Sequence, residues 1–134
     1  MSADARRQLI NPPELHPAPG FSHVAVKRGS RLGFIAGQVA LAPDFSVVGG
    51  DDLYEQTKQA MKNVKIALDA IGATFEDVVR RTVYTKDPTQ YETVSRAIEE
   101  VQGSTDHPPQ TILGVTGLAL PELLIEIECT VVLD

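Results

Sequence analysis

The run Leu124–Leu133 near the end of the chain constrains the fold more than any other segment, because its side chains alternate by type. Successive side chains of a β-strand point to opposite faces of a sheet, so the run predicts a strand with one face on a core. Glu126 and Glu128 then share the other face, roughly 6–7 Å apart at about 3.3 Å per residue. A carboxylate that lines a water-poor cleft can move protons, whereas one on a free face is only solvated. The two predicted faces carry Ile125, Ile127, Cys129, Val131 and Leu133 on one side and Glu126, Glu128, Thr130 and Val132 on the other.

The composition is that of one globular domain. Of the 134 residues, 43% are hydrophobic and 22% are charged, whereas a disordered chain would be poorer in apolar residues. The formal net charge of −6 argues against a general binder of nucleic acid or anionic membranes, since both need a basic surface. No apolar run approaches the roughly 20 residues of a membrane span, and we recognise no signal peptide. We therefore expect a cytoplasmic protein.

The cysteine and histidine residues predict neither a disulfide framework nor a metal site. Cys129 is the only cysteine, and its place on the apolar side of the last strand predicts a buried thiol. His16, His23 and His107 have no metal-ligand spacing among themselves or with Cys129. We therefore expect no metal site.

The first part of the chain predicts an arm and a pair of strands. Residues 1–20 hold four prolines and little hydrophobic periodicity, which indicates an extended arm, and residues 21–134 form the predicted single domain. Phe21–Lys27 and Arg31–Gln38 alternate well enough for two strands, with a turn at Arg28–Ser30 between them. We expect these two strands to pair as a hairpin.

A helix follows the hairpin. Apolar residues recur at helical spacing from Leu53 to Ile71, which predicts a helix with one buried side. Asp51 or Asp52 can cap its start. Gly72 is a fitting residue just past its end.

The remaining elements predict an α+β sandwich. Val78–Thr85 is rich in β-branched residues and reads as a strand, Pro88 or Thr89 opens a second helix, and Thr111–Val115 precedes the terminal strand. Two helices should cover one face of a mixed sheet. No helix is left for the other face, which carries Val132, so we expect that face to be buried against identical chains.

Several short motifs follow these elements in order: Phe21-Ser22-His23, Ala36-Gly37-Gln38, Gln56 and Asn63 of the first helix, Gly72-Ala73, Val78-Val79 with Thr82-Val83-Tyr84, Pro108-Pro109-Gln110-Thr111 and Ile125-Glu126-Ile127-Glu128. Each motif is short, but their order and spacing together are specific. The chain resembles the reactive-intermediate deaminase (RidA) family, also described as endoribonuclease L-PSP, over roughly residues 21–132.

The resemblance implies a chorismate-mutase-like α+β fold, assembled as a homotrimer with three clefts between subunits. In the best-known members the cleft hydrolyses reactive enamines or imines, such as 2-aminoacrylate, to a keto acid and ammonia, and no metal or organic cofactor is used. An arginine holds the substrate carboxylate as a planar two-point fork, and a glutamate positions or activates water. Glu126 matches that glutamate and is the expected catalytic residue.

Four positions of the implied substrate-binding pocket depart from the family pattern. Gln110 stands at the arginine position, Phe21 at a tyrosine, Ala36 at a serine and Ser95 at an asparagine. A neutral amide cannot supply the charge-assisted two-point contact, which removes on the order of 1.5–3 kcal/mol, or about one to two powers of ten in affinity. We therefore expect poor activity on 2-aminoacrylate and a different small imine, enamine or related C–N compound as substrate.

Other roles stay open. Thr111 begins a strand, and its backbone N–H is placed to help hold a substrate oxygen. Gln110 either bonds a neutral substrate amide or carbonyl or satisfies its own loop. Glu128 matches no functional position, so we expect a structural or ion-pairing role.

Two other functions compete with hydrolysis. If Glu126 only bonds backbone amides between subunits, the protein is a non-catalytic trimer that binds a small ligand or serves a regulatory contact. Endoribonuclease action, suggested by the family's other name, fits the acidic charge and the missing arginine poorly.

Overall fold

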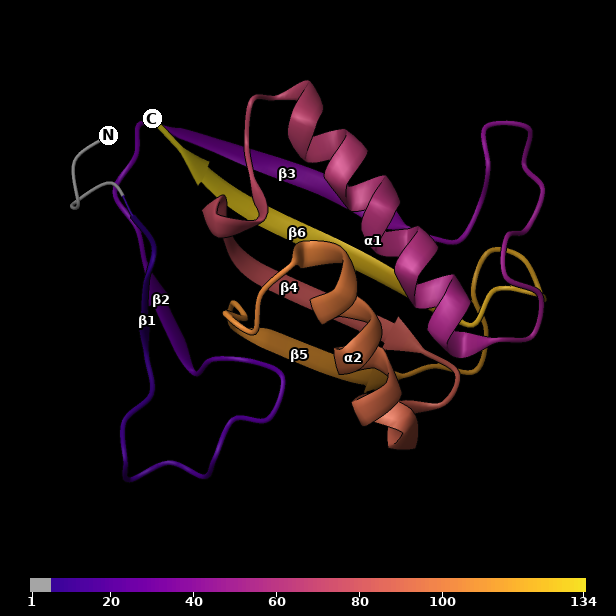
Figure 1. Ribbon diagram of the computed structural model, residues 1–134, viewed down its shortest axis with the longest axis horizontal. Helices are drawn as coiled ribbons and strands as arrows, with labels where there is room; N and C mark the ends of the chain where they lie inside the picture. Colours follow the sequence, from indigo (N-terminus) through magenta and orange to yellow (C-terminus); the bar gives the residue numbers. More distant parts are fainter. Residues whose placement is uncertain (1–5) are drawn as a thin grey trace.

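Strand β6 (Ile125–Leu133) lies at the centre of the fold (Figure 1). The computed structural model describes residues 6–134, and its main sheet has the strand order β3-β6-β4-β5. β6 runs antiparallel to β3 (Arg31–Gln38) and to β4 (Val78–Thr85), and β4 runs parallel to β5 (Gln110–Gly114). The predicted mixed sheet is confirmed.

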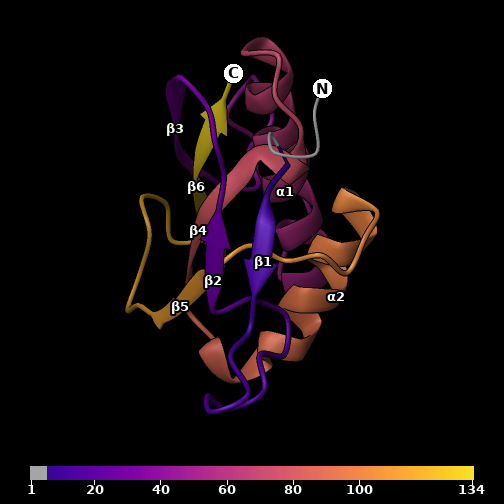
Figure 2. The same ribbon diagram turned by 90° about the vertical axis from the view of Figure 1, so that its left-hand side faces the viewer.

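Two helices cover one face of this sheet. α1 (Leu53–Ala70) and α2 (Tyr91–Gln102) lie on the same side of the strands in both views (Figures 1 and 2). Asp52 is the N-cap of α1, and its side chain accepts a hydrogen bond from the backbone N–H of Glu55 at 3.1 Å. Gly72, just past the end of α1, has a φ of 72°, a conformation that glycine adopts without strain. The predicted caps and the two-layer α+β fold are confirmed. Two short 3-10 turns complete the body, at Phe75–Asp77 before β4 and at Pro88–Gln90 before α2.

The alternation along β6 separates the core from the open face. Every second side chain from Ile125 to Leu133 is buried, and those between them are half-buried. Cys129 is among the buried ones, and burial raises the pKa of its thiol to about 11, so the predicted buried thiol is confirmed. The helices contribute Ala60, Met61, Val64, Leu68, Val94 and Ile98 to the same core.

The predicted hairpin is wrong. β2 (Val24–Val26) is shorter than the predicted strand Phe21–Lys27, and it pairs with β1 (Gln8–Ile10) in a separate two-stranded sheet. β3 pairs with β6 instead, with Arg31 opposite Leu133. The first two predicted strands therefore belong to different sheets.

The turn Arg28–Ser30 explains why β3 does not pair with β2. It packs against the end of β6, where the backbone N–H of Ser30 donates to the carbonyl of Leu133 at 2.8 Å. Gly29 lies so close to that carbonyl that a Cβ would overlap with it. The turn thus directs β3 to a long central partner with a buried face, and the apolar surface gained there outweighs a short local pairing.

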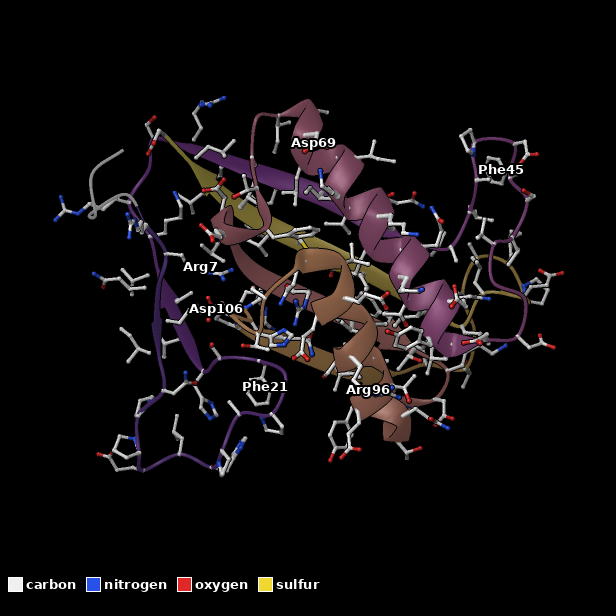
Figure 3. The ribbon with its side chains drawn as sticks, viewed as in Figure 1. Arg7, Phe21, Phe45, Asp69, Arg96 and Asp106 are labelled. Carbon is white, nitrogen blue, oxygen red and sulfur yellow. The ribbon has the colours of Figure 1, made fainter. Side chains whose placement is uncertain are left out.

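Arg7 ties the start of the N-terminal arm to the body. β1 lies in the predicted arm, of which residues 1–5 are outside the described part. Arg7 donates to the carbonyls of Phe75 and Val78 at 3.2 and 2.9 Å. It also donates to the carbonyl of Asp106 at 2.9 Å (Figure 3).

The sheet face opposite the helices carries exposed apolar side chains. Leu32 and Phe34 of β3 are 65% and 74% exposed, and Leu113 of β5 is 43% exposed. Figure 2 shows this face without a helix. Among residues 6–134, neither helix has the length and apolar character needed to cross a membrane.

Because one face of each element is buried and the other exposed, replacing an isoleucine by alanine should cost far more stability at a buried position than at an exposed one. Ile127→Ala should lower the free energy of unfolding by about 2–5 kcal/mol, because Ile127 is 0% exposed and its removal leaves a cavity. Ile66→Ala, at a side chain of α1 that is 66% exposed, is the matched control and should change it by less than about 0.5 kcal/mol. Urea denaturation followed by circular dichroism measures both, and equal losses would contradict the assigned core.

Candidate functional site

Glu126 lies on the open face of the sheet, above a glycine. In the register of β6 and β4 it stands opposite Tyr84, and it is half-buried. Its carboxylate lies over Gly37 of β3, where an added Cβ would overlap with it. Ala36, the preceding residue, is exposed on the same strand where the ladder between β3 and β6 is interrupted. The carboxylate of Glu126 therefore occupies space that is free only because residue 37 is a glycine.

A shallow hollow of about 220 Å³ adjoins on the same face. Arg80, at its edge, donates to the hydroxyl of Thr111 at 2.5 Å. Glu128 accepts a hydrogen bond from the Tyr84 hydroxyl at 2.5 Å, and this bond raises the pKa of Tyr84. Glu128 is thus hydrogen-bonded within the chain, while no side chain of residues 6–134 donates a hydrogen bond to Glu126. The hollow is lined by Phe34, Ile35, Arg80, Thr82, Glu128, Cys129 and Thr130.

Gln110 lies on the opposite, helix-covered face. It is the first residue of β5 and stands beside Arg81 of β4. The Nε of Arg81 donates to the Oε1 of Gln110 at 2.5 Å. Thr111, the next residue, points to the open face with Thr82, its partner across the strands. Gln110 and Thr111, although adjacent in the chain, therefore point to opposite faces of the sheet.

Arg81 is a buried cation at the centre of a hydrogen-bond network. Its side chain is 2% exposed, and desolvation lowers its pKa to about 10, so it remains charged at neutral pH. Besides Gln110 it reaches the Nδ1 of His107 at 2.9 Å and the Oε1 of Gln102 at 3.5 Å. It donates to the carbonyl of Gly20 at 3.2 Å.

The network fixes the protonation of His107. A guanidinium has donors only, so the Nδ1 that faces Arg81 is an acceptor and the ring proton sits on Nε2. That Nε2 lies 2.7 Å from Glu99 and donates to its carboxylate. Burial, the largest effect, lowers the pKa of His107, and the charge of Arg81 acts in the same direction. Glu99 thus balances the buried cation through a neutral histidine.

Phe21 and Ser95 belong to the Gln110 side of the molecule. Gly20, whose carbonyl Arg81 holds, has a φ of 75° and lies against the Oγ of Ser95 in α2. Phe21 follows directly, with its ring 5.3 Å from that of His23, and Figure 3 shows it on the N-terminal loop. An open hollow of about 320 Å³ lies beside this contact, lined by Pro19, Gly20, Tyr91, Glu92, Ser95 and Arg96.

The predicted site residues thus form two groups within one chain. Glu126, Ala36 and Thr111 are on the strands that border the open face. Gln110 and the carbonyl of Gly20, the residue before Phe21, bond to Arg81, and Ser95 lies against Gly20. Between residues 6 and 134, no three His, Cys, Asp or Glu side chains gather where they could hold a metal ion.

Sequence reasoning missed Arg81. A signal was present, because Arg81 alternates with Val83 and Thr85, which point to the core. An arginine at such an inward position must find several acceptors, since an unpaired buried charge is costly. The acceptors lie between 21 and 61 residues from Arg81 in the chain, and no local pattern brings them to it.

Comparisons with known proteins agree with this fold. The family model of endoribonuclease L-PSP matches residues 12–133. A crystal structure from Yersinia pestis, of a protein of unknown function in the conserved Rid family, is 40% identical, with a TM-score of 0.87 over 96% of this chain and 99% of that chain. A RutC family protein of Pyrococcus horikoshii is 35% identical over 78% of this chain and 80% of its own length. The chloroplast Reactive Intermediate Deaminase A of Arabidopsis thaliana is 26% identical over 96% of this chain and 67% of its own length. The chain belongs to the RidA/endoribonuclease L-PSP family, as the motifs predict.

His107 makes stability depend on pH. Its pKa in the folded protein is lowered, so the unfolded chain binds a proton more readily below about pH 6.5. The free energy of unfolding should therefore fall as the pH drops from about 6.5 toward the folded pKa, and this contribution is fully present above that window. Urea titrations between pH 7.5 and 5.5 measure the slope.

The slope should be smaller in His107→Gln than in the unchanged protein. His16→Gln is the matched control, because His16 is exposed and its side chain bonds only the carbonyl of Pro17 among the described residues. An undiminished slope in His107→Gln would disprove the assignment.

Proposed function

We propose that the protein is a hydrolase of the RidA type that acts without a cofactor on a small imine, enamine or related C–N compound, in clefts between the subunits of a homotrimer. The observation that carries this proposal is the position of Glu126. Glu126 is half-buried, its carboxylate lies over Gly37, and no side chain of residues 6–134 donates a hydrogen bond to it. The plant relative named as a reactive intermediate deaminase supports the reaction class.

The division of the site into two groups supports a cleft built from two chains. Within one chain, Glu126 faces the open side of the sheet and Gln110 faces the helices. A single pocket that uses both side chains therefore needs a neighbouring subunit. β5 is one of the two edge strands of the sheet, so a second chain can approach the strand that carries Gln110.

The exposed apolar side chains of the open face support the same assembly. Leu32, Phe34 and Leu113 are 43–74% exposed in the single chain. Each large apolar side chain removed from water contributes about 1.5–3 kcal/mol. Contact between copies of this face would bury these side chains and enclose Glu126, which strengthens its interaction with a substrate.

The proposed reaction is a hydrolysis in two stages. Glu126 takes a proton from water while the water oxygen bonds to the imine carbon and the electron pair of the C=N bond moves to nitrogen. Glu126 then passes that proton to the nitrogen and is a carboxylate again. The resulting carbinolamine loses ammonia when its C–N bond breaks and a C=O bond forms, with Glu126 passing the proton from the hydroxyl to the departing nitrogen. Backbone N–H groups near Thr111 and Gly114 would hold the developing oxygen.

Removing the carboxylate of Glu126 tests catalysis. Glu126→Gln should reduce ammonia release from imines generated in place by an amino acid oxidase about 10²–10⁴-fold, the range usual for a general acid or base. Glu128→Gln is the matched control and should retain most of the rate, because Glu128 is already bonded to Tyr84. Both rates are measured with a coupled glutamate dehydrogenase assay.

The two outcomes separate the competing functions. A protein that releases no ammonia above the uncatalysed rate, and whose ligand affinity changes only slightly in Glu126→Gln, would be a binding or regulatory module. If highly purified protein cleaves RNA and the Glu126→Gln variant does not, the endoribonuclease hypothesis is favoured instead.

A charge on the open face tests the assembly. Phe34→Glu should convert the trimer to a monomer and abolish activity, because it places a carboxylate in the proposed contact. Phe45→Glu is the matched control, since Phe45 is also 74% exposed but lies on the projecting loop before α1 (Figure 3). Light scattering gives the mass and circular dichroism the fold, and a trimeric Phe34→Glu protein would contradict the proposed interface.

A further inference from the structure

We propose that Arg81 is a positioning residue that fixes the amide of Gln110, so that Gln110 presents N–H donors to the ligand and the site selects small molecules with a carboxylate or carbonyl oxygen. The proposal rests on the proposed function only in placing the ligand beside Gln110. It assigns Gln110 one chemical role, whereas the sequence left two roles open, bonding a substrate group or satisfying its own loop.

The orientation of the Gln110 amide follows from the chemistry of its neighbour. Arginine has donors and no acceptor, so the atom of Gln110 that faces the Nε of Arg81 at 2.5 Å must be the amide oxygen. The NH₂ group then points away from the guanidinium. A flipped amide would set donor against donor beside a positive charge.

The NH₂ group of Gln110 is left for a ligand. The described residues provide no hydrogen-bond partner for its Nε2, yet among them no buried side-chain nitrogen or oxygen lacks a partner. The Nε2 is therefore accessible. Because the oxygen of the same amide is bound to a cation, the amide is polarised and its N–H groups become stronger donors.

Arg81 holds this orientation rigidly. Its guanidinium is bonded on its other sides to His107, Gln102 and the carbonyl of Gly20, and its side chain is 2% exposed. Rotating away would break these bonds within the core. The cation therefore stays behind Gln110 while a ligand enters and leaves.

This arrangement suits a ligand oxygen rather than a ligand N–H or ammonium group. An oxygen accepts from the Nε2 of Gln110 and is attracted by the charge of Arg81 behind it. A donor group would meet only donors and a positive charge. The attraction is weaker than direct contact with an arginine, because the charge acts through the intervening amide.

Replacing the amide by a carboxylate of the same shape tests the role of Gln110. Gln110→Glu keeps an oxygen for Arg81 but presents only acceptors to the ligand. The dissociation constant for pyruvate, used as a 2-oxo acid probe and followed by isothermal titration calorimetry, should rise on the order of ten- to a hundredfold. Equal affinity in Gln110→Glu and the unchanged protein would overturn the proposal.

Gln102→Glu is the matched control for charge. Gln102 also accepts from Arg81, at 3.5 Å, and its NH₂ group is bonded to the carbonyl of Ser104. The same change of charge beside the same guanidinium should shift the pyruvate dissociation constant no more than about threefold. Losses of equal size in the two variants would reduce the effect to general electrostatics and overturn the proposal.

Arg81→Lys tests the positioning role itself. A lysine keeps the charge but loses the planar fork that binds several acceptors. The KM for an imino acid substrate should rise severalfold, while kcat, which depends on Glu126, should change little. A fall in kcat with an unchanged KM would indicate a loosened structure and count against the proposal.

A measurement on the unchanged protein keeps the proposal testable if a variant fails to fold. In nitrogen-15 labelled protein, pyruvate should shift the side-chain NH₂ signals of Gln110 and slow their exchange with water. Unmoved signals at saturating pyruvate, or no pyruvate binding, would overturn it. If these signals respond but no ammonia is released from imines, the selection of ligand oxygens holds and the proposed hydrolysis fails. If ammonia is released at the same rate by Gln110→Glu, the hydrolysis holds and the selection fails.

Discussion

The strict alternation along β6 is the constraint on which the rest of the molecule depends. It places Ile125, Ile127 and Val131 in the core without exposure, and it requires Glu126 and Glu128 to face the other way. The two helices are needed on one side only. The opposite side is then free for chemistry and for contact with other chains.

A second constraint is the cost of keeping a charge inside the core. Removing a guanidinium from water costs several kcal/mol unless it is well bonded, and Arg81 meets acceptors from four segments of the chain. One of them, His107, links it to Glu99 near the surface of α2. The same bonds that satisfy the cation therefore hold the loop before Phe21 and the start of β5 in place.

The sequence was sufficient where local pattern and tertiary packing agree. The helix with its Asp52 cap, the strand Val78–Thr85 and the two faces of the last strand follow from spacing alone. The hairpin of Phe21–Lys27 with Arg31–Gln38 was predicted wrongly, because β3 gains more by pairing with β6 than with its neighbour in the chain. β3 and β6 lie far apart in the chain, with Arg31 opposite Leu133. Their pairing is decided by the apolar area that it buries, which a local sequence pattern does not measure.

The sequence named candidate residues for the site, and their identity stays a prediction, but it did not give their arrangement. Motif positions named Glu126 and Gln110, yet whether they share a pocket depends on which face each side chain occupies. Gln110 stands next to Thr111 in the chain and still points the other way. The partner that orients Gln110, Arg81, comes from the neighbouring strand, and only the three-dimensional register brings the two together.

The central position of β6 also bears on how a chain of this kind can vary in length. An insertion of one residue before Ile125 falls in the connection from β5 and leaves the frame of the strand intact. The same insertion within β6 would send every later side chain to the wrong side of the sheet. Carboxylates would then point into the apolar core and aliphatic groups to the open face. Length changes should therefore accumulate in residues 115–124 and be absent from the strand that follows.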